Sequence, residues 1–145
     1  MNKSALILAL IIAFTIPALA ELPSVTSWSK GDMSVTATVK GEKDDIIDGL
    51  VRAINASGGT IADSDQLGST VIIKTDWFTM PHNVWAYDCK LSFNITKGGA
   101  PGLYTLVSRG NLRAQIDGSH VTDNEVRPFL RRLIKSMASG GWVEP

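Results

Sequence analysis

The residues that most suggest a nucleophilic site are a single cysteine, Cys89, and two histidines, His82 and His120. A histidine near a thiol can help to form the reactive thiolate. Cys89, however, lies two residues from both Tyr87 and Leu91 in an alternating stretch, and alternate side chains of a strand point to the same face. We therefore expect the thiol to face the core, where it behaves as a small apolar group. The alternatives are a catalytic thiol and an exposed or intermolecular thiol.

The two histidines also raise the question of a metal site, together with Asp76, Asp88 or Asp117. They lie in separate predicted loops and lack the His-x-His or His-x-x-x-His spacing of chelating pairs. No serine lies in a Gly-x-Ser-x-Gly motif, and no glycine-rich stretch joins a strand to a helix as a phosphate loop does. The sequence thus predicts no catalytic residue, no metal site and no cofactor. We expect a protein that is not an enzyme, with a hydrolase built on Cys89 or His82 as the alternative.

Two groups of residues could instead bind a partner. Apolar and aromatic residues crowd the loop before the longest predicted strand, at Trp77, Phe78, Met80, His82 and Trp85. The last predicted helix carries a basic face, formed by Arg127, Arg131, Arg132 and Lys135. Such a face attracts anionic lipid head groups, peptidoglycan carboxylates or an acidic protein, with an ordinary solvated helix face as the alternative. The apolar loop is the expected rim of a pocket or docking surface.

The amino end has the parts of a secretory signal peptide. Lys3 precedes an apolar run over residues 5–16, and small residues stand at Ala18 and Ala20. The run is shorter than the ~20 apolar residues that span a bilayer, so a retained anchor helix is only the alternative. We expect cleavage near Ala20, a mature chain that starts at Glu21, and a periplasmic or secreted protein without a membrane span.

Composition limits the classes of partner. The chain has 14 basic and 14 acidic residues, so its formal net charge is zero and nothing indicates a nucleic-acid surface. With one cysteine, an exported form has no internal disulfide and depends on its core. We expect residues 1–20 to be the signal peptide, residues 21–32 an irregular lead-in whose Trp28 tucks against the domain, and residues 33–145 a single domain.

The stretch 84–95 is the clearest strand and organises the rest of the domain. Its apolar and polar residues alternate, which predicts one apolar and one polar face. The apolar face consists of Trp85, Tyr87, Cys89, Leu91, Phe93 and Ile95. We expect two amphipathic helices to pack on this face.

Those helices are indicated where apolar residues recur at helical spacing, in 42–57 and 126–137. Four carboxylates at the start of the first helix complement its dipole, with a cation site as the alternative. The second helix follows Thr122-Asp123-Asn124-Glu125, which has capping-box spacing, although Pro128 fits better if the cap is Asp123 or Asn124. The other strands are expected at 33–40, 60–63, 69–77, 103–108 and 112–117, with a hairpin over Arg109-Gly110-Asn111 between the last two.

The element order β-α-β-β-β-β-β-α predicts an α+β two-layer sandwich, in which a mainly antiparallel sheet is covered on one face by two helices. From Ser34 to Met137 this order resembles the small helix-grip domains of accessory lipoproteins in the bacterial outer-membrane assembly machinery. The chain lacks the cysteine that lipoproteins acylate at the cleavage site, so no functional residue is transferred. The resemblance implies a scaffolding or binding role.

We therefore expect an exported, non-enzymatic binding or accessory protein that acts on another protein of the cell envelope. The alternative is a carrier of a small apolar ligand or lipid, bound between the sheet and the second helix. The carrier requires a cavity of ~300 Å³ or more. Its expected lining is Trp85, Tyr87, Leu106 and Phe129.

Overall fold

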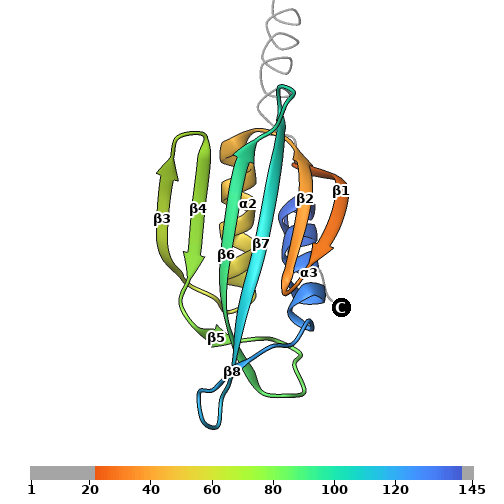
Figure 1. Cartoon of the computed structure of the whole chain (residues 1–145). Coiled ribbons are helices and arrows are strands. Elements are labelled where there is room, and N and C mark those ends of the chain that lie inside the picture. Colours follow the sequence, from red (N-terminus) through yellow and green to blue (C-terminus); the bar gives the residue numbers. More distant parts are fainter. Residues whose placement is uncertain (1–21, 142–145) are drawn as a thin grey trace, which may run out of the picture.

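A computed structural model describes residues 22–141 of the chain; the expected signal peptide, Glu21 and residues 142–145 lie outside this part. The described residues form an antiparallel sheet with two helices on one face (Figure 1). The elements are β1 (Ser24–Gly31), β2 (Ser34–Lys40), α2 (Lys43–Ala56), β3 (Ile61–Leu67), β4 (Thr70–Thr75), β5 (Phe78–Thr79), β6 (Tyr87–Lys97), β7 (Leu103–Ala114), β8 (His120–Val121) and α3 (Val126–Ser139). The predicted α+β two-layer class and element order are confirmed, and the structure adds β1, β5 and β8.

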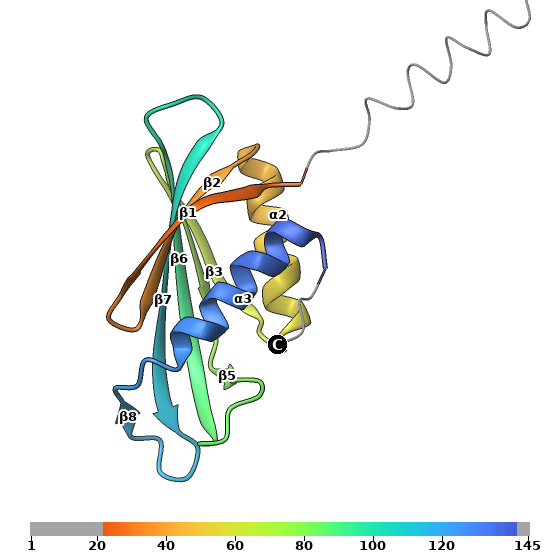
Figure 2. The ribbon, with the colours of Figure 1, turned by 90° about the vertical axis from the view of Figure 1, so that its right-hand side faces the viewer.

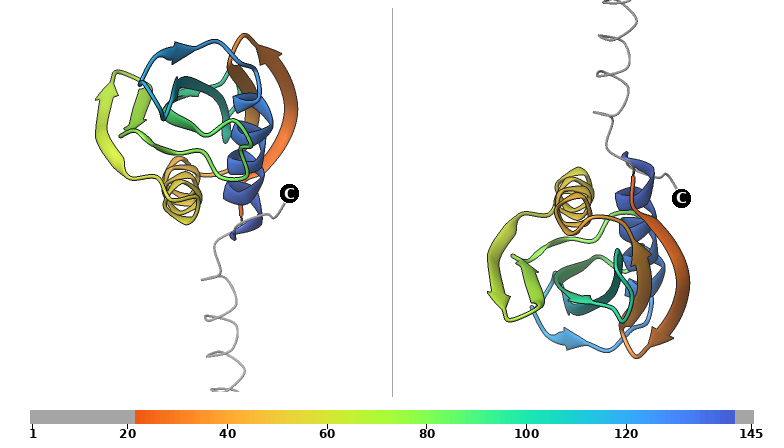
Figure 3. Two further views of the ribbon diagram at one scale, coloured as in Figure 1. Left: turned by 90° about the horizontal axis from the view of Figure 1, so that it is seen from below. Right: turned by 90° about the horizontal axis from the view of Figure 1, so that it is seen from above.

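The sheet has the strand order β1-β2-β7-β6-β4-β3, with β5 paired to β6 and β8 paired to β7. Its centre is the long pairing of β6 with β7, which runs in register from Tyr87 opposite Ala114 to Lys97 opposite Tyr104. Seen from either end, the sheet curls around the two helices, with β1 and β3 at its two edges (Figure 3). Figure 2 shows α3 crossing the concave side of the sheet.

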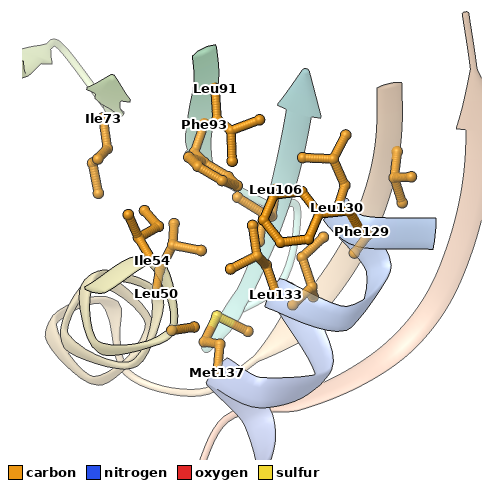
Figure 4. Packing of buried hydrophobic residues seen from close by; sticks show 14 of the residues in the cluster. Leu50, Ile54, Ile73, Leu91, Phe93, Leu106, Phe129, Leu130, Leu133 and Met137 are labelled. Atoms are coloured by element: carbon orange, nitrogen blue, oxygen red, sulfur yellow. The ribbon is translucent and has the colours of Figure 1, made fainter. Parts of the chain in front are cut away.

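The core lies between the sheet and both helices, as the alternation in β6 predicts. Cys89, Leu91, Phe93 and Ile95 are at most 1% exposed. Figure 4 shows Phe93 among side chains from the neighbouring strands and from both helices. The core side chains of α2 and α3 that meet there include Leu50, Ile54, Leu130, Leu133 and Met137.

The predicted strand 84–95 starts later than expected, at Tyr87. Ala86 has φ 54, a left-handed conformation that turns the chain just before the strand. Trp85 is therefore not on the apolar face of β6: its side chain is 61% exposed. Tyr87 is half-buried at the end of that face.

The irregular lead-in expected at 21–32 is wrong, because most of it forms strand β1. Its sequence is rich in serine and mostly exposed, so it carries little local strand signal. It is held by pairing along β2 from Ser24 to Gly31, with a bulge between Val25 and Ser27. Trp28 packs against the core, as expected.

The hairpin expected at Arg109-Gly110-Asn111 is also wrong, because β7 runs without a break from Leu103 to Ala114. Gly110 is required there for a tertiary reason. A Cβ at this position would clash with Val126 Cγ2, where α3 begins. The glycine lets the start of the helix rest on the bare backbone of the strand.

The capping box expected at Thr122 does not form. Helix α3 begins at Val126, with Glu125 as its N-cap and no side-chain cap hydrogen bond. The Asp123 carboxylate instead accepts a hydrogen bond from the Glu125 N–H at 2.9 Å. Pro128 is then in the first turn, where a backbone N–H has no helical partner and proline is tolerated.

Candidate functional site: the groove between strand β1 and helix α3

The structure places some of the predicted binding residues at the edge of the core and others in the lining of open pockets, whereas Trp85 and Lys135 are exposed and line none of the pockets described here. Met80 is buried in the core, and Phe78 packs edge-on against Phe129 with ring centroids 6.2 Å apart. Trp77 lies under the guanidinium of Arg113, whose Cζ is 4.3 Å from the ring centroid. These three predicted site residues therefore have structural partners that account for their positions.

His82 and Trp85 lie on the loop between β5 and β6, which is tied to the start of α3 by Glu125. One carboxylate oxygen of Glu125 accepts from Trp85 Nε1 at 3.1 Å, and the other accepts from Asn83 Nδ2 at 3.3 Å. His82 has φ 57, and such a left-handed conformation is uncommon for a residue other than glycine. A pocket of about 270 Å³ lies beside this loop. Its lining is Met80, Pro81, His82, Asn83, Glu125, Pro128, Phe129 and Arg132.

The four basic residues predicted on α3 do not act as one face. Arg132 lines the loop pocket, and Lys135 is exposed and lines none of the pockets described below. Arg127 and Arg131, one helical turn apart, line a different and larger pocket on the β1 side. The predicted basic face is thus divided between two sites.

That larger pocket is a groove of about 550 Å³ between α3 and the β1–β2 hairpin; we call it the β1–α3 groove. Its lining is Trp28, Ser29, Lys30, Val35, Asn124, Arg127, Pro128 and Arg131. The first three residues come from β1 and the last four from α3 and the turn before it. Figure 3 shows β1 beside α3 at this edge of the sheet.

Strand register explains why Trp28 and Lys30 face the helix. They pair with Ala37 and Val35 of β2, which are buried in the core, and residues directly opposite each other point to the same face. The Trp28 and Lys30 side chains therefore emerge on the concave side of the sheet, where α3 lies. β2 thus fixes one wall of the groove.

The other wall is fixed by contacts between α3 and the turn of the hairpin. The Met33 N–H donates to Asn124 Oδ1 at 2.7 Å, and Arg127 Nη1 donates to the Gly31 carbonyl at 3.4 Å. Above the groove, the Arg131 Cζ lies 5.0 Å from the Trp28 ring centroid, which is cation–π distance. These three contacts fix the position of α3 relative to the hairpin.

The groove is cationic. Lys30, Arg127 and Arg131 line it, no carboxylate does, and none of the three forms an ion pair with any residue in 22–141. The two acidic residues just before α3 have other partners, since Asp123 accepts from the Glu125 N–H and Glu125 accepts from Trp85 in the β5–β6 loop. Asp32, in the β1–β2 turn, does not belong to the groove lining. Guanidinium groups bind carboxylates in a fork geometry, and a tryptophan ring offers a flat apolar surface. The groove therefore suits a ligand that combines negative charge with an apolar group.

The predicted catalytic alternatives find no support in the geometry around Cys89. The thiol is fully buried, and burial, reinforced by the nearby Asp88 carboxylate, raises the pKa of Cys89 to about 12. Asp88 itself pairs with Arg113 at 3.5 Å and accepts from Gln115 at 3.0 Å. Among residues 22–141, no three His, Cys, Asp or Glu side chains cluster in a way that could hold a metal ion.

Of the four residues expected to line the cavity of an apolar-ligand carrier, three do not line any of the pockets described here, although the β1–α3 groove does lie between the sheet and the second helix. Leu106 is completely buried between sheet and helices, whereas Trp85 is on the outside. The loop pocket and the groove include only Phe129 of the four expected lining residues, and a third pocket, of about 130 Å³, lies between α2 and the end of α3. The groove is the largest of these three pockets.

Sequence reasoning found Arg127 and Arg131 but missed Trp28, Lys30 and Asn124. Trp28 and Lys30 are two residues apart, so they share one face of a strand. That spacing indicates a shared site only once β1 is recognised as a strand. Asn124 had no local signal, because its partner, the Met33 N–H, is 91 positions away in the sequence.

No helix within residues 22–141 is both long and apolar enough to cross a bilayer. Compared with known proteins, the chain matches no family model, and no curated protein matches it in sequence.

Proposed function

We propose that this chain is an exported, non-enzymatic binding protein that holds an acidic segment of another cell-envelope protein in the β1–α3 groove. The observation that carries the proposal is the lining of that groove, which includes Lys30, Arg127, Arg131 and Trp28 but no carboxylate. Export is proposed from the amino-terminal pattern of Lys3, an apolar run and Ala20.

The charge distribution favours a peptide segment over a nucleic acid. Nucleic-acid surfaces need an extended positive field, but the whole chain carries zero formal net charge. Here three cations line one groove together with an aromatic ring, which matches a short stretch with acidic and apolar side chains. The acidic segment is therefore expected to bind through a few central contacts, with Trp28 and Arg131 as anchors.

The proposal is tested by titrating the mature protein with a synthetic peptide in which glutamates flank a phenylalanine and threonines fill the other positions. The matched control peptide has glutamine in place of each glutamate. We expect the glutamate peptide to bind, with an affinity that falls as salt is raised, and the glutamine peptide to bind at least about tenfold more weakly. Isothermal calorimetry measures both affinities.

Variants locate the binding. The double variant Arg127→Glu and Arg131→Glu should lower the affinity for the glutamate peptide at least about tenfold, because it replaces electrostatic attraction by repulsion. The matched control is the double variant Lys74→Glu and Lys90→Glu, which makes the same change in net charge. Both lysines are exposed, on β4 and β6, and neither lines the groove. Equal affinity for both peptides, or an equal loss in the control variant, would contradict the proposal.

A further inference from the structure

We propose that the acidic segment binds by adding a strand to the free edge of β1, so that every second side chain of the segment enters the β1–α3 groove. This inference rests on the function proposed above and specifies how the partner is held. It assigns a main-chain docking edge to β1 and an extended conformation to the bound segment.

The first observation is the edge itself. β1 stands at the end of the sheet, and within residues 22–141 its only strand partner is β2. It is eight residues long, contains no proline, and most of its residues are exposed. An edge strand presents unpaired N–H and C=O groups that can accept another strand, and in β1 the regular stretch for such pairing runs from Ser27 to Gly31, after the bulge.

The second observation is that the strand with the free edge also forms one wall of the groove. Trp28 and Lys30 project from β1 toward α3, and α3 packs against β1. A strand paired to β1 would lie about 4.8 Å beyond it, with alternate side chains on this same concave side. Those side chains would extend the β1 wall of the groove and face α3 beside Trp28 and Lys30.

The spacing of the cations fits such a strand. Arg127 and Arg131 are four residues apart on α3, which corresponds to about 6 Å along the helix axis. Side chains on one face of a strand are about 6.7 Å apart. Consecutive groove-facing acids of an added strand can therefore each meet an arginine, with the residue between them pointing to solvent.

The opposite edge of the sheet does not offer the same site. β3 carries Asp63 and Asp65 along its length, and its helix-side neighbour α2 starts with Asp44 and Asp45. An acidic segment would be repelled there. The asymmetry between the two edges selects β1 for an acidic partner.

Amide hydrogen exchange tests strand addition directly, using the same glutamate peptide with the mature protein. In an antiparallel or parallel ladder, alternate N–H groups of an edge strand point outward. At saturating peptide we expect alternate amides of β1 to exchange at least about tenfold more slowly, while the amides of β3 keep their rates as an internal control.

Peptides with N-methyl groups on alternate residues give a second readout. Two such peptides are compared, one methylated at the odd positions and one at the even positions. In one of them methylation removes the N–H donors that face β1, and in the other it leaves those donors intact. We expect one set to lose at least about tenfold in affinity and the other to bind as the unmodified peptide does.

Each other outcome is decisive. Charge-dependent binding with unchanged β1 exchange would overturn strand addition and leave the proposed function standing. No binding of the glutamate peptide would overturn both. A second copy of the chain could instead pair with this edge through its acidic strand β3. The oligomer size would then increase with protein concentration, and the peptide would leave the amide exchange rates of β1 unchanged. This outcome would also overturn the inference.

Discussion

At the scale of single residues, the setting of Cys89 explains how a lone thiol can persist without reacting. Its sulfur lies in the core, and burial together with the nearby Asp88 carboxylate raises the pKa to about 12 from an ordinary 9.0. This shift lowers the thiolate fraction near pH 8 by about a thousandfold. The side chain is therefore an apolar filler in the position where the sequence places its only thiol.

We expect a thiol reagent at pH 8 to modify Cys89 rapidly in urea and at least about a thousandfold more slowly in the folded protein. The time course of a chromogenic disulfide reagent measures both rates. Comparable rates in the two states would show that the thiol is accessible.

The same shift makes stability depend on pH at the alkaline side. The unfolded chain releases the Cys89 proton above about pH 9, whereas the folded chain keeps it up to about pH 12. The contribution of Cys89 is thus complete below pH 9 and falls by about 1.4 kcal/mol per pH unit between these values. Urea unfolding of wild type and Cys89→Ala at pH 8 and pH 10 should show a smaller difference at pH 10. A difference independent of pH would contradict the assignment.

At the scale of elements, the packing of α3 against the sheet depends on Gly110 in the middle of β7. A Cβ at position 110 would clash with Val126 Cγ2. We expect Gly110→Ala to lower the free energy of unfolding by about 1–3 kcal/mol through overpacking, measured by urea denaturation. Gly99→Ala is the control, since a Cβ there meets nothing within 4 Å.

A double-mutant cycle separates overpacking from a general cost of alanine in the strand. Adding Val126→Ala removes the clashing methyl groups, so the double variant should be more stable than the sum of the two single changes predicts. Strict additivity would mean that Gly110 is needed for a reason other than its contact with α3.

Hydrophobic periodicity was enough to predict the elements that bury one face in the core. The alternation of Cys89, Leu91 and Phe93 and the helical spacing of Leu130 and Leu133 predicted the layers correctly, because burial of one face leaves a direct trace in sequence. β1 was missed because its order comes from pairing with β2, and polar residues on an edge strand leave no such trace. Gly110 was misread as a turn because its cause, Val126, lies elsewhere in the chain.

Part of the candidate site could be predicted from sequence, namely the residues that a local pattern identifies. Arg127 and Arg131 were identified from the charge pattern of one helix, which is local information. Their grouping with Trp28 and Lys30, and their separation from Arg132, follow from how α3 lies on a curled sheet. Local patterns name candidate residues, but long-range packing decides which of them share a site.

At the scale of the whole molecule, the amino end of the described fold leaves little room between the expected cleavage point and the first strand. β1 begins at Ser24, and cleavage after Ala20 would leave only Glu21, Leu22 and Pro23 before it. We expect protein recovered from the envelope fraction of a bacterial host to begin at Glu21, as determined by amino-terminal sequencing. Recovery of the chain beginning at Met1, in the membrane, would support the retained-anchor alternative.

The two walls of the β1–α3 groove come from the first strand and the last helix of the described fold. The hydrogen bond from Arg127 to the Gly31 carbonyl joins positions 96 apart in the sequence. A chain that has emerged only as far as β7 has Trp28 and Lys30 but neither arginine. The groove therefore comes into existence only when folding is finished, and a partner that uses it can distinguish a completed molecule from an unfinished or truncated one.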